Sequence, residues 1–337
     1  MPYRFKLHEP VDDAVRRIFS EQVARACHEL SSDEELAPVA IHDSRKAIKR
    51  LRALLRLARP ALGTVKFQTH NESLRDIAAA LSQARDDDVI TETIDKLETH
   101  FGSDGVQVLA PLRQIKARAA LVKARMSVAA AQAVAERLAR ENELFAKVDF
   151  QADLLTLVAG LRQSYRKAVT ALAAACEKPD DDVFHDLRKT VQWHWRQLAL
   201  ISRAWPDYFK VRVDAARDLS QILGDEHDLS LLRAYVVEQA DLTTEHQGSI
   251  VRMAQARQEE LRHEAISRAT LLLAERPKQF ANRMAKYWAA GRDLQAADGR
   301  DARKPEEKTP ALQAAKGGDA PKFPPKAVHD QRSKRRA

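Results

Sequence analysis

The sequence predicts an all-helical protein, and three features of its composition support that prediction. Glycine accounts for only 10 of the 337 residues, and aromatic residues make up 6% of the chain. Alanine, leucine, arginine and glutamate are abundant, and these residues favour helices, whereas β-branched and aromatic residues favour sheets. The chain is therefore expected to fold from helices alone.

Helix-breaking residues divide the chain into segments of helical length. The predicted helices of the first half cover 9–30, 38–59, 67–98 and 104–146. Those of the second half cover 151–177, 181–204, 208–239 and 245–274, followed by a short helix near 277–290. The breaks between helices fall at stretches that contain proline or glycine, namely Pro60 and Gly63, Phe101–Gly105, Lys178–Asp180, Trp205–Asp207 and Arg276–Pro277.

Several classes of protein are excluded by composition. The two cysteines, Cys27 and Cys176, are too few for a disulfide framework, which indicates a reducing compartment. No stretch of 18 apolar residues is present, so an ordinary transmembrane helix is not expected. The first residues, Met1–Lys6, lack the apolar region of a cleaved signal peptide. These features predict a soluble, cytoplasmic protein without a membrane partner.

Positive charge is concentrated at one end of the chain. The formal net charge is +8, but residues 292–337 contain 12 Lys/Arg and 7 Asp/Glu and so contribute +5 of it. The segment is rich in proline and poor in large apolar side chains, which predicts a disordered basic tail. This tail is interpreted either as a solubilising segment or as an auxiliary contact to an anion. The remaining 1–291 is predicted to be the folded domain.

An internal repeat organises that domain. The segment Ile41–Ile48 (IHDSRKAI) recurs as Phe184–Val191 (FHDLRKTV), at an offset of 143 residues. Further on, Arg75–Leu81 recurs as Arg217–Leu223 at an offset of 142, and Arg85 then aligns with His227. The order and spacing of the two matches predict two copies of one unit, repeat 1 at about 1–148 and repeat 2 at about 149–291.

Each repeat has room for about four helices with short connections, and this predicts one four-helix bundle per repeat, the two bundles being related by pseudo-symmetry. In repeat 1, the helix 38–59 is amphipathic, with Ile48, Leu51 and Leu54 on its apolar face. Its opposite face, within about 80° of His42, carries cations only. They are Arg45, Lys46, Lys49, Arg50, Arg52 and Arg56.

Two interpretations of this basic face are open. A solvated helix face is the commoner explanation for a run of charges, but such a face normally mixes both signs. A linear array of Arg and Lys is instead suited to an extended anion, since Arg offers bidentate donors and Lys a point charge. The single sign of the face favours the anion.

Repeat 2 carries a weaker version of the same face. It keeps the cations Arg188, Lys189 and Arg196, while Gln192, Trp193 and Trp195 occupy the positions of Lys49, Arg50 and Arg52. Arg166, on the preceding helix, adds a cation if that helix packs alongside.

Both repeats also place a histidine at the same position, His42 and His185. Each is interpreted either as an anion contact or as a local hydrogen-bonding residue. Neighbouring cations are expected to lower the pKa of both imidazoles.

The chain resembles the conserved-histidine α-helical domain family, CHAD. The resemblance rests on the motif His42–Arg52 and its counterpart Phe184–Lys189, on the segments Ala84–Val89 and Leu223–Leu229, and on the closing segment Pro277–Trp288. It implies two pseudo-symmetric four-helix bundles that line a central basic groove. It also implies binding of inorganic polyphosphate, with association to polyphosphate granules.

By matched position, the resemblance assigns phosphate contacts to His42, Arg45, Lys46, Lys49, Arg50 and Arg52 in repeat 1 and to His185, Arg188 and Lys189 in repeat 2. Arg56, Arg85, Arg166 and Arg196 complete the predicted set of polyphosphate-binding residues. Thr190 and Gln192 stand where the family usually has cations, so repeat 2 is expected to bind less strongly.

Catalysis is not expected. Phosphoanhydride cleavage usually requires a metal held by carboxylates, and three consecutive helical residues, Asp86–Asp88, cannot chelate one ion. The pair Glu141 and Glu143 comes closest to a tunnel hydrolase signature but lacks its lysine. No metal site and no cofactor motif is predicted.

Two non-enzymatic alternatives to a polyphosphate binder remain. One is a general polyanion or nucleic-acid binder, in which tryptophans stack on bases. The other is a purely structural bundle.

Overall fold

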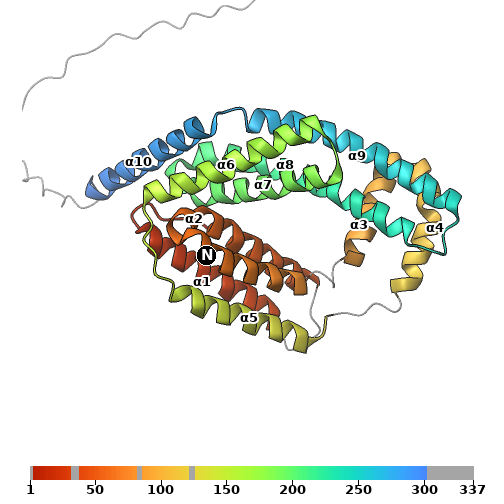
Figure 1. Cartoon of the computed structure of the whole chain (residues 1–337), viewed down its shortest axis with the longest axis horizontal. Helices are drawn as coiled ribbons and strands as arrows, with labels where there is room; N and C mark the ends of the chain where they lie inside the picture. Colours follow the sequence, from red (N-terminus) through yellow and green to blue (C-terminus); the bar gives the residue numbers. More distant parts are fainter. Residues whose placement is uncertain (1–2, 32–37, 82–85, 121–125, 302–337) are drawn as a thin grey trace, which may run out of the picture. The chain divides into compact units, whose positions relative to one another are not determined.

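The computed structural model describes residues 3–31, 38–81, 86–120 and 126–301. In these ranges the chain is helical throughout and contains no strand (Figure 1). Its elements are α1 (Val11–Leu30), α2 (Pro38–Ala80), α3 (Asp86–Phe101), α4 (Ser103–Ala120), α5 (Val128–Ala146), α6 (Leu154–Glu177), α7 (Asp181–Leu200), a short 3₁₀ helix (Ser202–Ala204), α8 (Pro206–Val237), α9 (Thr244–Leu272) and α10 (Pro277–Asp301). The all-helical prediction is confirmed for this part of the chain, and most of the predicted tail, 302–337, lies outside it.

Helices α6 to α9 begin and end close to their predicted positions. Side-chain caps fix three of their starts: Asp153 before α6, Asp180 before α7 and Thr243 before α9 each accept a hydrogen bond from a backbone N–H of the first turn. Pro206 occupies the first turn of α8, where a missing N–H costs nothing. Helix α10 runs to Asp301 rather than ending near 290, so the predicted disorder of the tail is wrong for 292–301.

Repeat 1 differs from its predicted helices. The predicted break at Pro60 and Gly63 occurs at Gly63, whose φ of 76° lies in the left-handed region, while Pro60 stays inside the helix. The predicted single helix 67–98 is instead the end of α2 and the separate helix α3, and 104–146 is α4 and α5. These predictions of single helices were wrong because α3 and α4 leave α2 and pack elsewhere.

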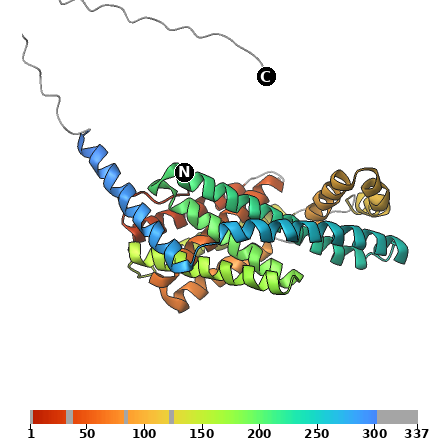
Figure 2. The ribbon, with the colours of Figure 1, turned by 90° about the horizontal axis from the view of Figure 1, so that it is seen from above.

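Two hydrophobic cores hold the helices together. The larger core joins α1, α2 and α5 to α6, α7 and the parts of α8 and α9 nearest to them. The smaller core joins α3 and α4 to the C-terminal half of α8 and the N-terminal half of α9. Figures 1 and 2 show this division, with α3 and α4 beside the ends of α8 and α9 that are far from α1 and α2.

The arrangement of one four-helix bundle per repeat is not confirmed. By the repeat offset of 142, Ile90 of α3 corresponds to Leu232 of α8, and both lie in the smaller core. The equivalent hairpins of the two repeats therefore pack against each other, so the smaller core contains residues of both repeats.

Close backbone contacts also join the repeats in the larger core. A Cβ atom added to Gly160 of α6 would lie only 1.9 Å from the carbonyl oxygen of Leu57 on α2. Gln197 of α7 donates a hydrogen bond to the carbonyl of Ala53, at 3.3 Å. The middle of α2 is thus fixed directly against α6 and α7, and this contact sets the position of its basic face.

A buried polar triad closes α5 onto α2. The Glu141 carboxylate lies 2.6 Å from His70 Nδ1 and accepts a hydrogen bond of 2.6 Å from the Ser73 hydroxyl. Both Glu141 and His70 are buried. Glu141, one of the residues nearest to a hydrolase signature, therefore holds two helices together in this structure.

None of the described helices combines the length and apolar character that crossing a bilayer requires.

Candidate functional site

A cavity of about 830 Å³ lies where α2, α3, α7 and α8 meet. Its lining residues come from both repeats, from α2 and α3 of repeat 1 and from α7 and α8 of repeat 2. They are His42, Arg45, Lys46, Lys49, Arg50, Val89, Glu92, Lys96, Arg188, Gln192, Trp195, Arg196, Arg217, Ser220, Gln221, Gly224, His227, Asp228 and Leu231. We refer to this space as the central cavity.

The central cavity is strongly cationic. Among its described lining residues, eight are Arg or Lys, and only Glu92 and Asp228 carry a carboxylate. Cations gathered in a concave space reinforce one another's potential and attract anions from solution. The net charge of the helical domain is small, so this property depends on where the cations lie.

Helix α2 supplies the largest share of this charge. Its apolar side is buried in the larger core, for example at Ile48, Leu51 and Leu54, and this packing turns the opposite side to the cavity. Lys46 Nζ lies 3.9 Å from Asp43, which also contacts Arg25 at 3.4 Å. Asp43 is thus shared between two cations and lowers the repulsion at the start of α2.

Arg50 and Arg196 form the deepest cationic part of the site. Arg50 lies 5.4 Å above the Tyr3 ring and donates to Gln22 Oε1 at 3.2 Å. Arg196 is 6% exposed, lies 4.2 Å from the Trp195 ring and donates to the Gln192 carbonyl at 2.8 Å. Burial lowers the pKa of both groups, that of Arg196 to about 10, and both remain charged at neutral pH.

These two guanidinium groups have donors to spare. The Nε atoms of Arg50 and Arg196 are buried and have no hydrogen-bond acceptor among the described residues. An uncompensated buried donor is costly, and an anion in the cavity supplies the missing acceptors.

Lys96, Arg217 and His227 also line the cavity, although the sequence did not predict them as site residues. Lys96 of α3 pairs with Asp225 of α8 at 2.7 Å, which also ties the hairpin of repeat 1 to repeat 2. Arg217 of α8 lies 5.3 Å from the Trp195 ring. His227 was noted as the counterpart of Arg85 and as part of the segment Leu223–Leu229, but it was not assigned a contact.

The histidines occupy different environments in the two repeats. His42 lines the cavity, whereas His185 lies behind His227, with their ring centroids 4.6 Å apart. Burial and the nearby Arg188 lower the pKa of both imidazoles in repeat 2, that of His227 to about 4. The expected lowering of the pKa is confirmed for His185.

Seven of the predicted site residues line the cavity: His42, Arg45, Lys46, Lys49, Arg50, Arg188 and Arg196. Five others do not, namely Arg52, Arg56, Arg166, His185 and Lys189. Arg52 donates instead to Asn71 at 3.3 Å, and Lys189 pairs with Asp186 at 2.5 Å. Arg85 and the side chains of Asp86, Asp87 and Asp88 lie outside the described residues.

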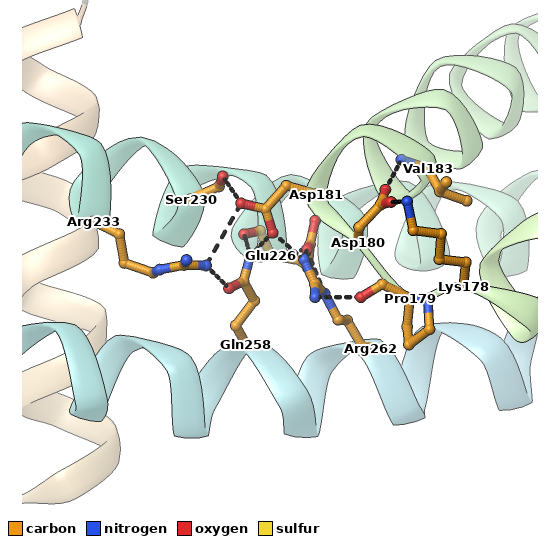
Figure 3. Close-up of polar contacts among 10 residues, drawn as sticks. All are labelled: Lys178, Pro179, Asp180, Asp181, Val183, Glu226, Ser230, Arg233, Gln258 and Arg262. Carbon is orange, nitrogen blue, oxygen red and sulfur yellow. Dashed lines mark hydrogen bonds and ion pairs between the residues drawn. The ribbon is translucent and has the colours of Figure 1, made fainter.

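A polar network holds the start of α7, which carries His185 and Arg188, against α8 and α9 (Figure 3). Asp181 accepts hydrogen bonds from Ser230, at 2.6 Å, and from Arg262. Arg262 also donates to the buried Glu226 at 2.8 Å and to the Pro179 carbonyl at 2.7 Å. Burial raises the pKa of Glu226, against the influence of Arg262.

This network positions the cavity wall. Glu226 and His227 are neighbours on α8, so the network holds the backbone that carries His227 toward the site. Within the described ranges, no three His, Cys, Asp or Glu side chains gather in a way that holds a metal ion. The arrangement is suited to binding a polyanion by many direct ionic contacts.

Comparison with known proteins supports the resemblance seen in the sequence. Residues 17–237 match the CHAD domain. Among solved structures, PptA from Streptomyces chartreusis is similar in fold, with a TM-score of 0.54 and 15% sequence identity, over 77% of this chain and 99% of that one. No match was found among curated proteins. Because the match to the CHAD domain covers more than half of its length, the chain belongs to the CHAD family.

Proposed function

We propose that this protein binds inorganic polyphosphate in the central cavity without cleaving it. The observation that carries the proposal is the excess of eight Arg and Lys over two carboxylates among the described lining residues. Polyphosphate has about one negative charge per phosphate unit and no apolar surface, so it requires a dense set of cationic donors and no apolar contact.

The geometry of the donors fits a chain of phosphates. Lys46, Lys49 and Arg50 lie within two turns of α2, and α7 adds Arg188 and Arg196 to the same cavity. Successive phosphates of an extended chain thereby meet cations from both repeats. Arginine binds phosphate through two parallel hydrogen bonds, and lysine adds a point charge.

The surroundings of Trp195 favour polyphosphate over nucleic acid. Its indole is the only tryptophan among the described lining residues. The guanidinium groups of Arg196 and Arg217 lie over it at 4.2 and 5.3 Å. The ring is therefore engaged by cations, whereas binding of single-stranded nucleic acid relies on aromatic faces that stack with bases.

The proposed role is that of a binding module in the cytoplasm, with recruitment to polyphosphate granules. Family membership and the cationic cavity support this role. The two carboxylates of the cavity, Glu92 and Asp228, come from different helices and are outnumbered by cations, which is unfavourable for holding a catalytic metal.

A competition experiment tests the ligand. Labelled polyphosphate bound to the protein is challenged with unlabelled polyphosphate, DNA, RNA and heparin at matched anionic charge. We expect unlabelled polyphosphate to displace the label at a concentration at least tenfold lower than nucleic acid does. Equal displacement by DNA or RNA would favour a general polyanion binder. Affinity is also expected to fall steeply with salt, by analogy with counterion release from nucleic acids.

A charge-removal variant tests the site. Replacing Arg45, Lys46 and Lys49 together by alanine is expected to weaken polyphosphate binding by two orders of magnitude or more, with helicity unchanged by circular dichroism. The matched control replaces Arg137, Arg140 and Lys147, three exposed cations in and just after α5. If both variants lose the same affinity, net charge rather than the cavity determines binding.

Measuring the release of free phosphate tests whether the protein leaves polyphosphate uncleaved. The protein is incubated with polyphosphate, with and without Mg²⁺, and chain length and free phosphate are followed. Turnover that is absent from the triple alanine variant would show that the cavity is an active site.

A further inference from the structure

A second group of cations lies outside the central cavity, at the junction of α2, α6 and α7. Arg56 and Arg59 come from α2, and Arg166 and Lys167 come from α6. Trp193 of α7 lines the same small pocket as Arg56, Arg59 and Lys167. We call these four cations and Trp193 the α2–α6 cluster. None of them lines the central cavity.

Arg56 is the centre of the cluster. Its guanidinium lies 3.7 Å from the centroid of the Trp193 ring and 5.5 Å from that of Phe67. Burial and the neighbouring Arg52 and Arg59 lower its pKa to about 10. The buried Nε atom of Arg56 has no acceptor within the described ranges. An arginine stacked and desolvated in this way retains N–H donors at its edge, because stacking occupies only the faces of the group.

The other cations of the cluster add positive charge, and no nearby carboxylate among the described residues neutralises it. Burial, Arg56, Arg59 and Arg166 all lower the pKa of Lys167. In the part of the chain that the structure describes, no carboxylate lies within 4.0 Å of the cationic groups of Arg56, Arg59, Arg166 or Lys167. Mutual repulsion among these four groups is a cost to the folded protein that a bound anion removes.

Three of the four cations line one small pocket. A pocket of about 10 Å³ lies between Arg56, Arg59 and Lys167, and its remaining lining residues are Gln163, Ser164 and Trp193. This volume is close to that of one water molecule by the same measure, which is the size of one phosphate oxygen. The pocket is thus small and polar, and it is unsuited to a nucleobase or an apolar side chain.

Helices α2 and α7 contribute residues to both the cluster and the central cavity. On α7, Trp193 faces the cluster, whereas Gln192 and Trp195 face the central cavity. The contact of Gln197 with the Ala53 carbonyl fixes α2 against α7 between Arg50 and Arg56. The relative positions of cavity and cluster are therefore set by rigid helices.

We propose that the α2–α6 cluster is a second phosphate-binding site, which takes a phosphate group of the same class of condensed phosphate chains as the central cavity. The proposal rests on the proposed function, since it extends the ligand of the cavity to another surface. A chain long enough to reach both sites binds more tightly than a short one, because its second contact is intramolecular. The protein thereby selects for chain length.

Fluorine NMR of protein labelled with 5-fluorotryptophan tests the two sites separately. Trp195 reports on the central cavity and Trp193 on the cluster, and each resonance is assigned with a Trp→Phe variant. Titration with long-chain polyphosphate is expected to shift both resonances. A shift of Trp195 alone would overturn the second site and leave the proposed function intact, whereas no shift of either would contradict both.

A paired variant removes the cluster without touching the cavity. Arg59→Gln with Lys167→Gln is expected to abolish the shift of Trp193 and to weaken binding of long-chain polyphosphate about fivefold, while the affinity for tripolyphosphate in the cavity is unchanged. The control, Arg137→Gln with Arg140→Gln, removes the same charge from α5 and should change neither. A Trp193 shift that persists in the Arg59/Lys167 variant would show that it is relayed through α7, and would overturn the proposal.

Discussion

The two repeats contribute differently to the central cavity. Helix α2 of repeat 1 brings four described cations to it, Arg45, Lys46, Lys49 and Arg50, whereas α7, its counterpart in repeat 2, brings two, Arg188 and Arg196. Repeat 2 instead supplies longer, unbroken helices: α8 has 32 residues and α9 has 29, where repeat 1 divides the equivalent stretches among several helices. Repeat 1 thus supplies most of the cations of the cavity, and repeat 2 supplies the long helices α8 and α9.

This difference shows why neither repeat forms the site alone. The charges of α2 face a wall built from α7 and α8, and Lys96 of repeat 1 reaches the cavity because its hairpin packs on repeat 2. Substitutions at the contact between the repeats, in the framework of repeat 2 and at equivalent lysines of the two repeats test this difference.

The largest effect is expected at the contact between the repeats. Gly160→Val places side-chain atoms against the Leu57 backbone, where even a Cβ would lie 1.9 Å from the carbonyl oxygen. Because backbone cannot move aside as a side chain does, we expect the free energy of unfolding to fall by about 3 kcal/mol or more in urea denaturation. Gly224→Ala is the control, since a Cβ there meets nothing within 4 Å. It should raise stability by up to ~1 kcal/mol. Similar losses in both would mean that α2 and α6 can separate at little cost.

A smaller loss is expected in the framework of repeat 2. Glu226→Gln removes the negative charge of the buried carboxylate, which lies 2.8 Å from Arg262. The positive charge of the guanidinium is then less well neutralised. We expect a loss of about 2 kcal/mol in thermal or urea unfolding. The nearby exposed Glu259→Gln should change stability by less than about 0.5 kcal/mol. An unchanged stability of the Glu226 variant would show that the network of Figure 3 does not hold α7 to α8 and α9.

A third test compares equivalent lysines. Lys46 lines the cavity, whereas its counterpart Lys189 does not and pairs with Asp186 at 2.5 Å. Lys46→Ala is expected to weaken polyphosphate binding about fivefold, the size of one ionic contact worth roughly 1 kcal/mol, and Lys189→Ala less than twofold. Isothermal titration calorimetry at low salt measures both. Equal losses would mean that the two repeats bind symmetrically.

The smallest effect is a dependence on pH that His227 of repeat 2 should produce. The pKa of His227 is lowered to about 4, so this imidazole is neutral at pH 7 in the unliganded protein. A bound anion favours the protonated form and raises that pKa, and the affinity must then increase as the pH falls. Between pH 7.5 and 5.5 at constant ionic strength, we expect the wild-type protein to gain about threefold in affinity over His227→Gln. Parallel pH profiles would exclude His227 as a contact.

The sequence predicted the local structure of this chain better than its tertiary packing. Helix-breaking stretches such as Lys178–Asp180 and Trp205–Asp207, together with the motif repeat, led to the helices of repeat 2. The separation of α3 from α2 was missed, because the residues around Ala80 have good helix propensity. It follows from burial of Ile90, Ile94 and their neighbours against α8 and α9, a long-range contact that local patterns do not contain.

Tertiary packing also decides which of the predicted binding residues line the cavity. A helical wheel grouped Arg45, Arg52 and Arg56 on one face, yet only Arg45 lines the cavity. Positions seven residues apart drift by about 20° around the helix. Arg52 donates to Asn71 on the later part of α2, and Arg56 lies against Trp193 of α7, so neither reaches the cavity. Lys96 and Arg217 were missed because each lies on a helix of mixed charge, where only tertiary packing distinguishes it.

The pairing of the two hairpins also affects how the chain acquires its structure. The smaller core joins α3 and α4 to segments that follow them at the repeat offset of 142 residues, so its contacts have a high contact order. During synthesis, the apolar faces of α3 and α4 stay without their partners until α8 and α9 have emerged from the ribosome. A fragment containing repeat 1 alone therefore exposes Ile90, Ile94 and Leu97, and is expected to aggregate or to require a chaperone until repeat 2 is supplied.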